Sequence, residues 1–264
     1  MTYSVHIGSG GYLGWKILAR TMTTQRNAFV QSSAMETARD YFARKMPEVV
    51  TAESFVNDRK LLTVALRAFG LDADINSRYF IRKVLEADPE DKSSLVNRLA
   101  DKRYLNLNRA FSAYFSSATE ALDVDLSEIL ERYNSRSFEK NIGEQYAEIE
   151  LALNAQRELR EIARADISEN AKWYQILASK PLRQIFEGAY GLRGGFSALP
   201  VDRQLSELKT KTAKLTGSDG VSQFSSGQAL ESILRRYLLR SQMEASPATS
   251  GYSVALALLT SRPP

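Results

Sequence analysis

The sequence predicts an all-α protein: a compact bundle of duplicated helical hairpins with one long central helix. Two observations lead to this class. Apolar residues recur three and four positions apart along most of the chain, whereas the apolar and polar alternation of strands is scarce. A related phrase also occurs three times, as DRKLLTVALRAFGL at 58–71, DKRYLNLNRAFSA at 101–113 and SKPLRQIFEGAYGL at 179–192.

Each copy of the phrase has the parts of a short helix. It starts with Asp or Ser, whose side chains accept hydrogen bonds from the free N–H groups of a first helical turn. Gly70 and Gly191 end two copies and suit the left-handed C-cap conformation, whereas the second copy has Ser112 at this place. The aromatic residues before these positions are predicted to be equivalent and buried: Phe69, Phe111 and Tyr190.

The phrases belong to longer hairpin units of unequal length. Three units are predicted near 37–71, 77–113 and 136–192, with a more degenerate fourth near 201–240. Their unequal lengths argue against a solenoid of fixed period. Ahead of them, the segment 12–32 is predicted to be one helix.

Further signals place the central helix and several helix starts. Apolar residues follow a helical spacing from 138 to 153 and predict one continuous helix over 137–165: Phe138, Ile142, Tyr146, Ile149 and Leu153. Asp125 with Glu128 forms a D-x-x-E cap pattern. Asp88-Pro89 and Ser179-Lys180-Pro181 each place a proline in a predicted first turn.

Three segments describe the predicted domain organisation. Residues 1–35 form an N-terminal helical segment, and residues 36–245 form the helical-repeat domain, with a sub-boundary near 192–200. Residues 246–264 form a linker and a short apolar end, whose longest apolar run is Val254 to Leu259. This run is too short to span a bilayer, and the N-terminus lacks the pattern of a Sec signal peptide.

The composition removes most catalytic chemistry. The chain has no cysteine and one histidine, His6, so thiolate chemistry and zinc sites with several imidazoles are excluded. The GSGGYLG opening lacks the third glycine of a dinucleotide fingerprint, because Leu13 stands there. Asp72, Asp74 and Asn76 start like a calcium loop, but Lys83 occupies the closing position, so helix capping is preferred. No catalytic, cofactor or metal residues are predicted.

Nucleic-acid binding is also not predicted. The segment Arg235-Arg236-Tyr237-Leu238-Leu239-Arg240 and the stretch from Arg78 to Arg109 are basic, but both are mixed with acidic or apolar residues. We interpret these arginines as residues that border the core and pair with acids. Trp15 and Trp173, at helical spacing, are interpreted as core residues.

The charge distribution predicts a protein-binding surface. Between 119 and 150, nine acids stand against three bases, a net charge of −6, in a chain whose total is +4. Such asymmetry can steer an acidic partner or hold an oligomer in register, and it also occurs where solvated helix faces carry opposite charge. Together with the terminal segments, it gives these candidate partner-binding residues: Trp15, Asp123, Asp125, Glu128, Glu144, Glu148, Tyr252 and Leu256.

Four long phrases carry a resemblance to a known family. They are GYLGWKILARTMTTQ at 11–25, VNDRKLLTVALRAFGLDADINSRYFIRKVLEADPEDKSSLVNRLADKRY at 56–104, ENAKWYQILASKPLRQIFEGAYGL at 169–192 and LESILRRYLLRSQ at 230–242. The chain resembles an alphaproteobacterial domain-of-unknown-function family that is commonly encoded among flagellar genes. The resemblance implies a helical protein linked to flagellar assembly or function, with no established activity.

Three functional hypotheses follow. The first is a non-enzymatic helical scaffold that binds a protein partner of the flagellar system, in the cytoplasm or at the flagellum. The second is a cytoplasmic flagellar export chaperone. The third is an enzyme with an unrecognised carboxylate pair. The sequence leaves the oligomeric state open.

Overall fold

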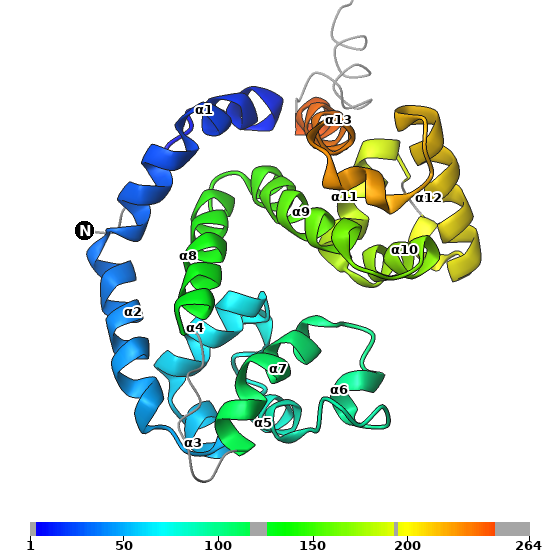
Figure 1. Cartoon of the computed structure of the whole chain (residues 1–264). Coiled ribbons are helices and arrows are strands. Elements are labelled where there is room, and N and C mark those ends of the chain that lie inside the picture. The colour runs from blue at the N-terminus through cyan, green and yellow to red at the C-terminus, as the bar shows by residue number, and fades with distance from the viewer. Residues whose placement is uncertain (1–3, 117–125, 193–194, 246–264) are drawn as a thin grey trace, which may run out of the picture. The chain divides into compact units, whose positions relative to one another are not determined.

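The computed structural model of the chain describes residues 4–116, 126–192 and 195–245. Throughout these ranges the regular elements are helices, namely thirteen α-helices and four short 3₁₀ helices (Figure 1). The all-α class predicted from the apolar periodicity is confirmed. None of the described helices is both long enough and apolar enough to cross a bilayer.

The chain divides into two compact units, each treated separately below. The residues of unit 1 lie in 1–5 and 22–141, and those of unit 2 lie in 6–21 and 142–264. Two helices therefore carry residues of both units: α1 (Gly11–Val30) and α8 (Leu126–Gly143). Helix α1 confirms the helix predicted over 12–32.

Unit 1 is built from short helices around a cluster of phenylalanine rings. Its remaining helices are α2 (Ser33–Lys45), η1 (Met46–Glu48), α3 (Ala52–Asn57), α4 (Arg59–Phe69), η2 (Asp72–Asp74), α5 (Arg78–Glu86), α6 (Leu95–Arg98) and α7 (Arg103–Ser116). Helix α4 packs against α2, α3 and α7. The ring centroids of Phe55 and Phe111 lie 5.1 Å apart, and those of Phe69 and Phe111 lie 6.3 Å apart. These rings form the centre of the unit 1 core.

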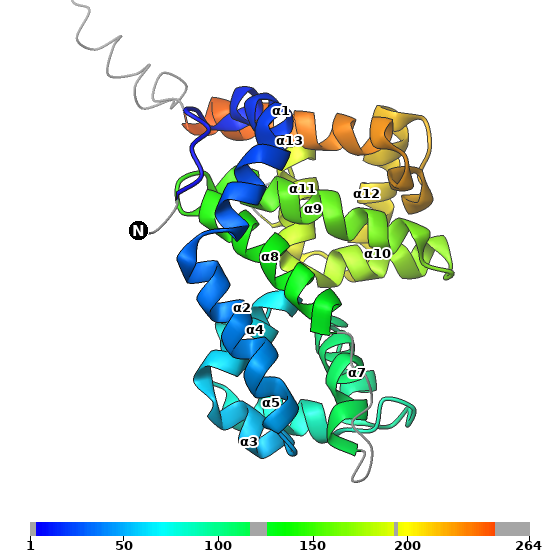
Figure 2. The same ribbon diagram turned by 60° about the vertical axis from the view of Figure 1, so that its left-hand side comes forward.

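Unit 2 is built around a second aromatic cluster. Its remaining helices are α9 (Ala147–Arg164), α10 (Glu169–Ala178), α11 (Lys180–Tyr190), η3 (Phe196–Ala198), α12 (Val201–Thr216), η4 (Val221–Ser225) and α13 (Gly227–Ala245). Helix α11 packs against both α9 and α13 (Figure 2). Trp173 lies edge-on to Phe186, with ring centroids 5.3 Å apart, and Phe186 lies 5.8 Å from Phe224. This packing fixes the position of α13, which carries the candidate site.

The first copy of the repeated phrase folds as predicted, and the third copy differs from its prediction at the helix start. Asp58 caps α4 by accepting hydrogen bonds from two backbone N–H groups. Ser179 occupies the N-cap position of α11, but its side chain accepts no hydrogen bond from the first turn, where Pro181 lies. Both helices end on a glycine in the left-handed conformation, with φ of 70° at Gly70 and 65° at Gly191. Because other residues adopt this conformation only at a cost, the glycine fixes where each helix ends.

The second copy ends differently, as its serine suggests. The carboxylate of Asp101 accepts a hydrogen bond of 3.0 Å from the backbone N–H of Arg103 at the start of α7. Helix α7 then continues beyond Ser112 to Ser116, because no glycine ends it. The predicted burial of the three aromatic positions is confirmed: Phe69 is 5%, Phe111 is 0% and Tyr190 is 8% exposed.

The prediction of one continuous helix over 137–165 was wrong, because the chain breaks between α8 and α9. Gly143 ends α8 and Ala147 begins α9, and the backbone N–H groups of Gln145 and Tyr146 both donate to the carbonyl of Ile142. A Cβ at position 143 would collide with the carboxylate of Glu150. Glycine therefore permits the close turn, and the apolar spacing continues across it.

Two predicted helix starts were also wrong. Asp88 and Pro89 lie in a loop, where Asp88 accepts a hydrogen bond of 2.9 Å from the N–H of Glu90, and the next helix begins only at Leu95. Asp74 does not cap a helix, because its carboxylate accepts a hydrogen bond of 2.8 Å from the hydroxyl of Tyr104. Short acidic residues satisfy turns and side-chain donors as readily as helix ends.

Candidate functional site

Half of the predicted partner-binding residues fall on described parts of the chain, and their surroundings differ. Trp15 is only 4% exposed, so it belongs to the core of unit 2. Glu148 accepts a hydrogen bond of 2.9 Å from the backbone N–H of Gly11 at the start of α1. Glu144 is exposed. The other predicted residues, Asp123, Asp125, Tyr252 and Leu256, lie outside the described residues.

The acids of α8 have basic neighbours. Glu128 pairs with Arg132 one turn later, at 2.8 Å, and Glu131 pairs with Arg26 of α1. An acid with a nearby arginine offers less net charge to a partner than the sequence count implies. The described part of the 119–150 segment therefore offers less acidic surface than the sequence suggests.

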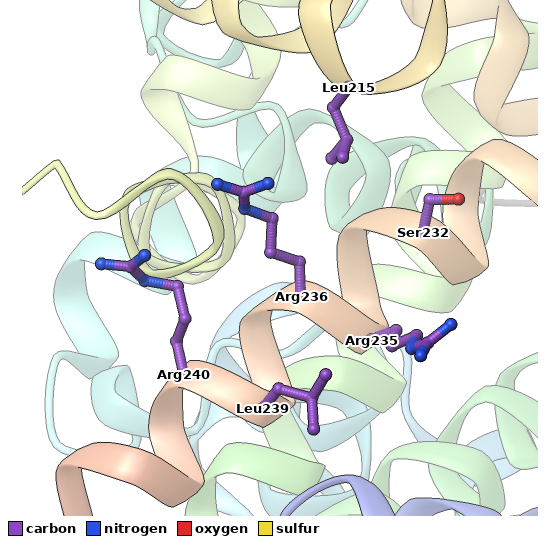
Figure 3. A pocket seen from close by; sticks show the side chains of 6 residues that line it. All are labelled: Leu215, Ser232, Arg235, Arg236, Leu239 and Arg240. Atoms are coloured by element: carbon purple, nitrogen blue, oxygen red, sulfur yellow. The ribbon is translucent and has the colours of Figure 1, made fainter.

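A basic groove lies instead between α12 and α13 of unit 2. Its volume is about 450 Å³, and most of its lining surface is apolar. Six residues line it: Leu215 of α12 and Ser232, Arg235, Arg236, Leu239 and Arg240 of α13 (Figure 3). We call this feature the arginine groove.

The amphipathic pattern of α13 explains why these side chains reach the surface. One face of the helix is buried in the unit 2 core, including Ile233, Leu234, Tyr237 and Leu238. The positions between them point outward, so Arg235, Arg236 and Leu239 are exposed. Arg236 and Arg240 stand four residues apart and extend side by side in Figure 3, whereas Arg235 extends to the other side of the helix.

Each arginine of the groove is held by a neighbour other than a carboxylate. Arg236 donates through Nε to the carbonyl oxygen of Ala189, at 2.8 Å, near the end of α11. The guanidinium of Arg235 lies over the ring of Tyr12, 5.6 Å from its centroid. The guanidinium of Arg240 packs against the backbone of Gly191, and its Nε is buried without a hydrogen-bond partner.

The groove therefore carries positive charge that the described residues leave unpaired. Within the described parts of unit 2, no acid lines it and none of its three arginines forms an ion pair. Arg236 also stabilises the C-terminal end of α11, where backbone carbonyls lack partners. Because a guanidinium has five N–H donors, this role leaves donors available to a ligand.

The neighbours that the sequence predicted for these arginines were wrong. They were expected to pair with acids, and the described structure pairs Arg236 with a backbone carbonyl 47 residues away. The available signal was local: two arginines four residues apart on a helix with a strong apolar face share one side of that helix. The identity of the neighbours required the tertiary structure.

Gly191 gives a direct test of how Arg240 is held. Gly191→Ala is expected to lower the free energy of unfolding by about 2–3 kcal/mol, through strain at positive φ and displacement of the guanidinium. Gly217→Ala is the matched control, because Gly217 also has positive φ (85°) but no neighbouring atom within 4 Å of an added Cβ. Urea denaturation measures both changes.

The Arg240→Ala background separates the two causes. There, the excess cost of Gly191→Ala over Gly217→Ala should disappear, because the clashing group is gone. An excess that persists in this background would mean that Arg240 is not held against Gly191.

A second polar cluster joins α10 to η4 in unit 2 and bears on enzymatic chemistry. Lys172 is buried, and its Nζ donates to the carbonyl of Ala163 at 3.0 Å, to Glu169 at 3.2 Å and to Ser222 at 2.6 Å. Burial raises the pKa of Glu169, but hydrogen bonds from Ser222, Lys172 and Val221 outweigh it and lower the pKa to about 2. A lysine that activates a serine must accept a proton, and this lysine uses three donors. The cluster therefore has a structural role, which is to hold η4 against α10.

A hollow in unit 1 differs from the arginine groove in its charge. Its volume is about 760 Å³, and its lining includes Val50, Leu85 and Phe115. Of its acids, Glu53 and Glu86 both pair with Arg82, at 3.2 Å and 2.7 Å. These pairs leave the hollow with less unpaired charge than the arginine groove.

Comparisons with known proteins agree with the fold. The family described as "Protein of unknown function (DUF1217)" matches residues 68–230, which is more than half of the chain. A crystal structure of a protein from Agrobacterium tumefaciens is similar, with a TM-score of 0.71 and 20% sequence identity over 93% of this chain and 98% of that chain. At this identity, the likeness shows a shared fold. No curated protein matches the chain.

Proposed function

We propose that this chain, which belongs to the DUF1217 family of proteins of unknown function, is a non-enzymatic interaction protein of the bacterial flagellum. Its arginine groove would bind an acidic segment of a protein partner. The observation that carries this proposal is a groove that the described residues line with three arginines and no acid, with each arginine held in place by a neighbouring group.

The way in which the arginines are held favours binding. A free arginine side chain loses rotamer freedom when it binds, which costs about 0.5–1.5 kcal/mol for each side chain. Ala189, Tyr12 and Gly191 already restrict the three guanidinium groups, so part of this ordering has taken place before a partner arrives. Guanidinium and carboxylate groups also form paired hydrogen bonds that are stronger than neutral ones.

The flagellar part of the proposal rests on the sequence phrases. GYLGWKILARTMTTQ and the three other phrases resemble a family commonly encoded among flagellar genes. The groove supports the non-enzymatic part of the proposal, because its residues suit binding of a charged protein surface better than catalysis. A scaffold of this kind would be found with its partner at the flagellum, whereas an export chaperone would stay in the cytoplasm in complex with one exported subunit.

Motility of a deletion strain provides the test. Deletion of the gene is expected to reduce swimming in soft agar, and the wild-type chain should restore it. The charge-reversed variant Arg236→Glu/Arg240→Glu should restore less than a tenth of the lost swimming, because its groove repels an acidic partner. Cell fractionation in the same strains shows whether the protein is at the flagellum.

The controls separate binding from folding. Arg160→Glu/Arg164→Glu changes the net charge equally at the same spacing on α9 and should restore swimming. Arg235→Glu leaves the hydrogen bond to Ala189 intact and should also impair swimming, with an unchanged circular dichroism melting curve. Normal swimming of the deletion strain, or full rescue by both groove variants, would refute the proposal.

A further inference from the structure

We infer that the segment bound in the arginine groove is an amphipathic α-helix with acidic residues three or four positions apart and a leucine-like residue on the same face. This inference rests on the proposed function and specifies the kind of partner. It follows from the order of groups along α13, the apolar share of the groove and the absence of a strand edge among the described residues.

The groups of α13 that line the groove form two rows along the helix axis. One row is Ser232, Arg236 and Arg240, and the other is Arg235 and Leu239, each with steps of four residues. Four residues of an α-helix rise about 6 Å. Two acids three or four positions apart on a facing helix have nearly the same separation, so one helix can present both to Arg236 and Arg240.

The apolar part of the groove favours an amphipathic helix over a polyanion as the ligand. Leu215 of α12 faces the groove from the opposite side, and Leu239 of α13, 40% exposed, lies between Arg240 and Arg235 (Figure 3). A nucleic-acid backbone or free phosphate would pair with the arginines and leave these leucines against a hydrated anion. An amphipathic helix covers both kinds of group at once, since its apolar and acidic residues lie on one face.

The backbone of the ligand gives a second reason for a helix. An extended peptide usually gains affinity by adding a strand to an exposed sheet edge. The regular elements of the described residues are all helices, so the groove offers no such edge. A helix satisfies its own backbone hydrogen bonds, and its side chains alone need to fit between α12 and α13.

A displayed library of random peptides tests the inference with the full chain as bait. Peptides of about 18 residues can form about five helical turns. After selection on the wild-type chain and counter-selection on Arg236→Gln/Arg240→Gln, the enriched sequences should carry acid pairs at spacings of three or four with an apolar residue on the same face. Synthetic copies should bind the wild-type chain at least tenfold more tightly than the variant and show helical circular dichroism when bound.

The alternative outcomes are distinct. Enrichment of acidic peptides without helical spacing would refute the helical conformation of the bound segment. It would not contradict the proposed function, which requires only that the segment is acidic. Failure to enrich arginine-dependent peptides, or tighter binding of single-stranded DNA or inorganic phosphate, would overturn the inference. The swimming assay judges the proposed function separately, because it does not depend on the conformation of the partner. Permuted peptides of the same composition that bind equally well would also count against a helix.

Discussion

Phe69→Ala is expected to lower the free energy of unfolding of unit 1 by about 3–5 kcal/mol. Phe69 ends α4, is 5% exposed and lies edge-on to Phe111, with ring centroids 6.3 Å apart. The guanidinium of Arg132 lies over the ring of Phe69, 5.7 Å from its centroid. Truncation would remove these contacts and leave a cavity in the aromatic cluster. Urea denaturation followed by tyrosine and tryptophan fluorescence and by circular dichroism measures the change.

An exposed aromatic residue of the same unit serves as the control. Tyr79 on α5 is 72% exposed, so Tyr79→Ala should change stability by about 0.5 kcal/mol or less. Both units contribute to the far-ultraviolet signal, so two transitions would be fitted separately. A loss below about 1 kcal/mol for Phe69→Ala would contradict the central place of this ring in the core.

The ends of α4 and α11 were predictable because their signals are local. In α4 the capping side chain of Asp58, an apolar face and a glycine with positive φ all fall within one short phrase. In α11 the apolar face and the glycine act in the same way, whereas the side chain of Ser179 makes no cap hydrogen bond. The burial of Phe69 and Tyr190 followed from their place in the same phrase. Here the physical cause and the sequence signal lie within a few residues of each other.

The break between α8 and α9 could not be predicted from the same kind of signal. Ile142, Tyr146 and Ile149 keep a helical spacing across it, so the periodicity continues where the backbone turns. Gly143 is tolerated inside a helix at a cost of about 1 kcal/mol, and glycine alone therefore does not indicate a break. What decides is the close approach of Glu150 to Gly143, which exists only once the turn has formed.

The arginine groove depends on contacts between residues far apart in the chain. Arg235 meets Tyr12, and Arg236 meets Ala189, because the packing of unit 2 brings α1, α11 and α13 together. The sequence places the arginines on one helix but does not indicate whether an acid lies opposite. The net charge of the sequence likewise predicted an acidic binding surface in 119–150, but two of its acids, Glu128 and Glu131, pair with arginines. Net charge along a chain is thus a weak guide to unpaired charge on its surface.

Glu169 is expected to make the stability of unit 2 depend on pH below about 4.5. Its side chain accepts hydrogen bonds from Ser222, Lys172 and the backbone of Val221, and its pKa falls from 4.5 to about 2. A carboxylate whose pKa is lower in the folded state stabilises the fold above its unfolded pKa. That contribution is lost as the pH falls from about 4.5 towards 2. Because the side chain is 38% exposed, solvent screening reduces the contribution to about 1–2 kcal/mol.

Glu169→Gln tests this dependence directly. At pH 7 the variant should be about 1–2 kcal/mol less stable than the wild type, because an amide is a weaker acceptor for Lys172 and Ser222. The difference should shrink as the pH falls below about 4.5, since the wild type loses the same charge by protonation. Glu161→Gln, at an exposed position of α9, is the matched control and should show a small difference at every pH. Urea denaturation of the wild type and both variants between pH 2.5 and 7 measures these differences. A Glu169→Gln difference that stays constant to the lowest pH would show that the stability of this cluster does not depend on the charge of Glu169.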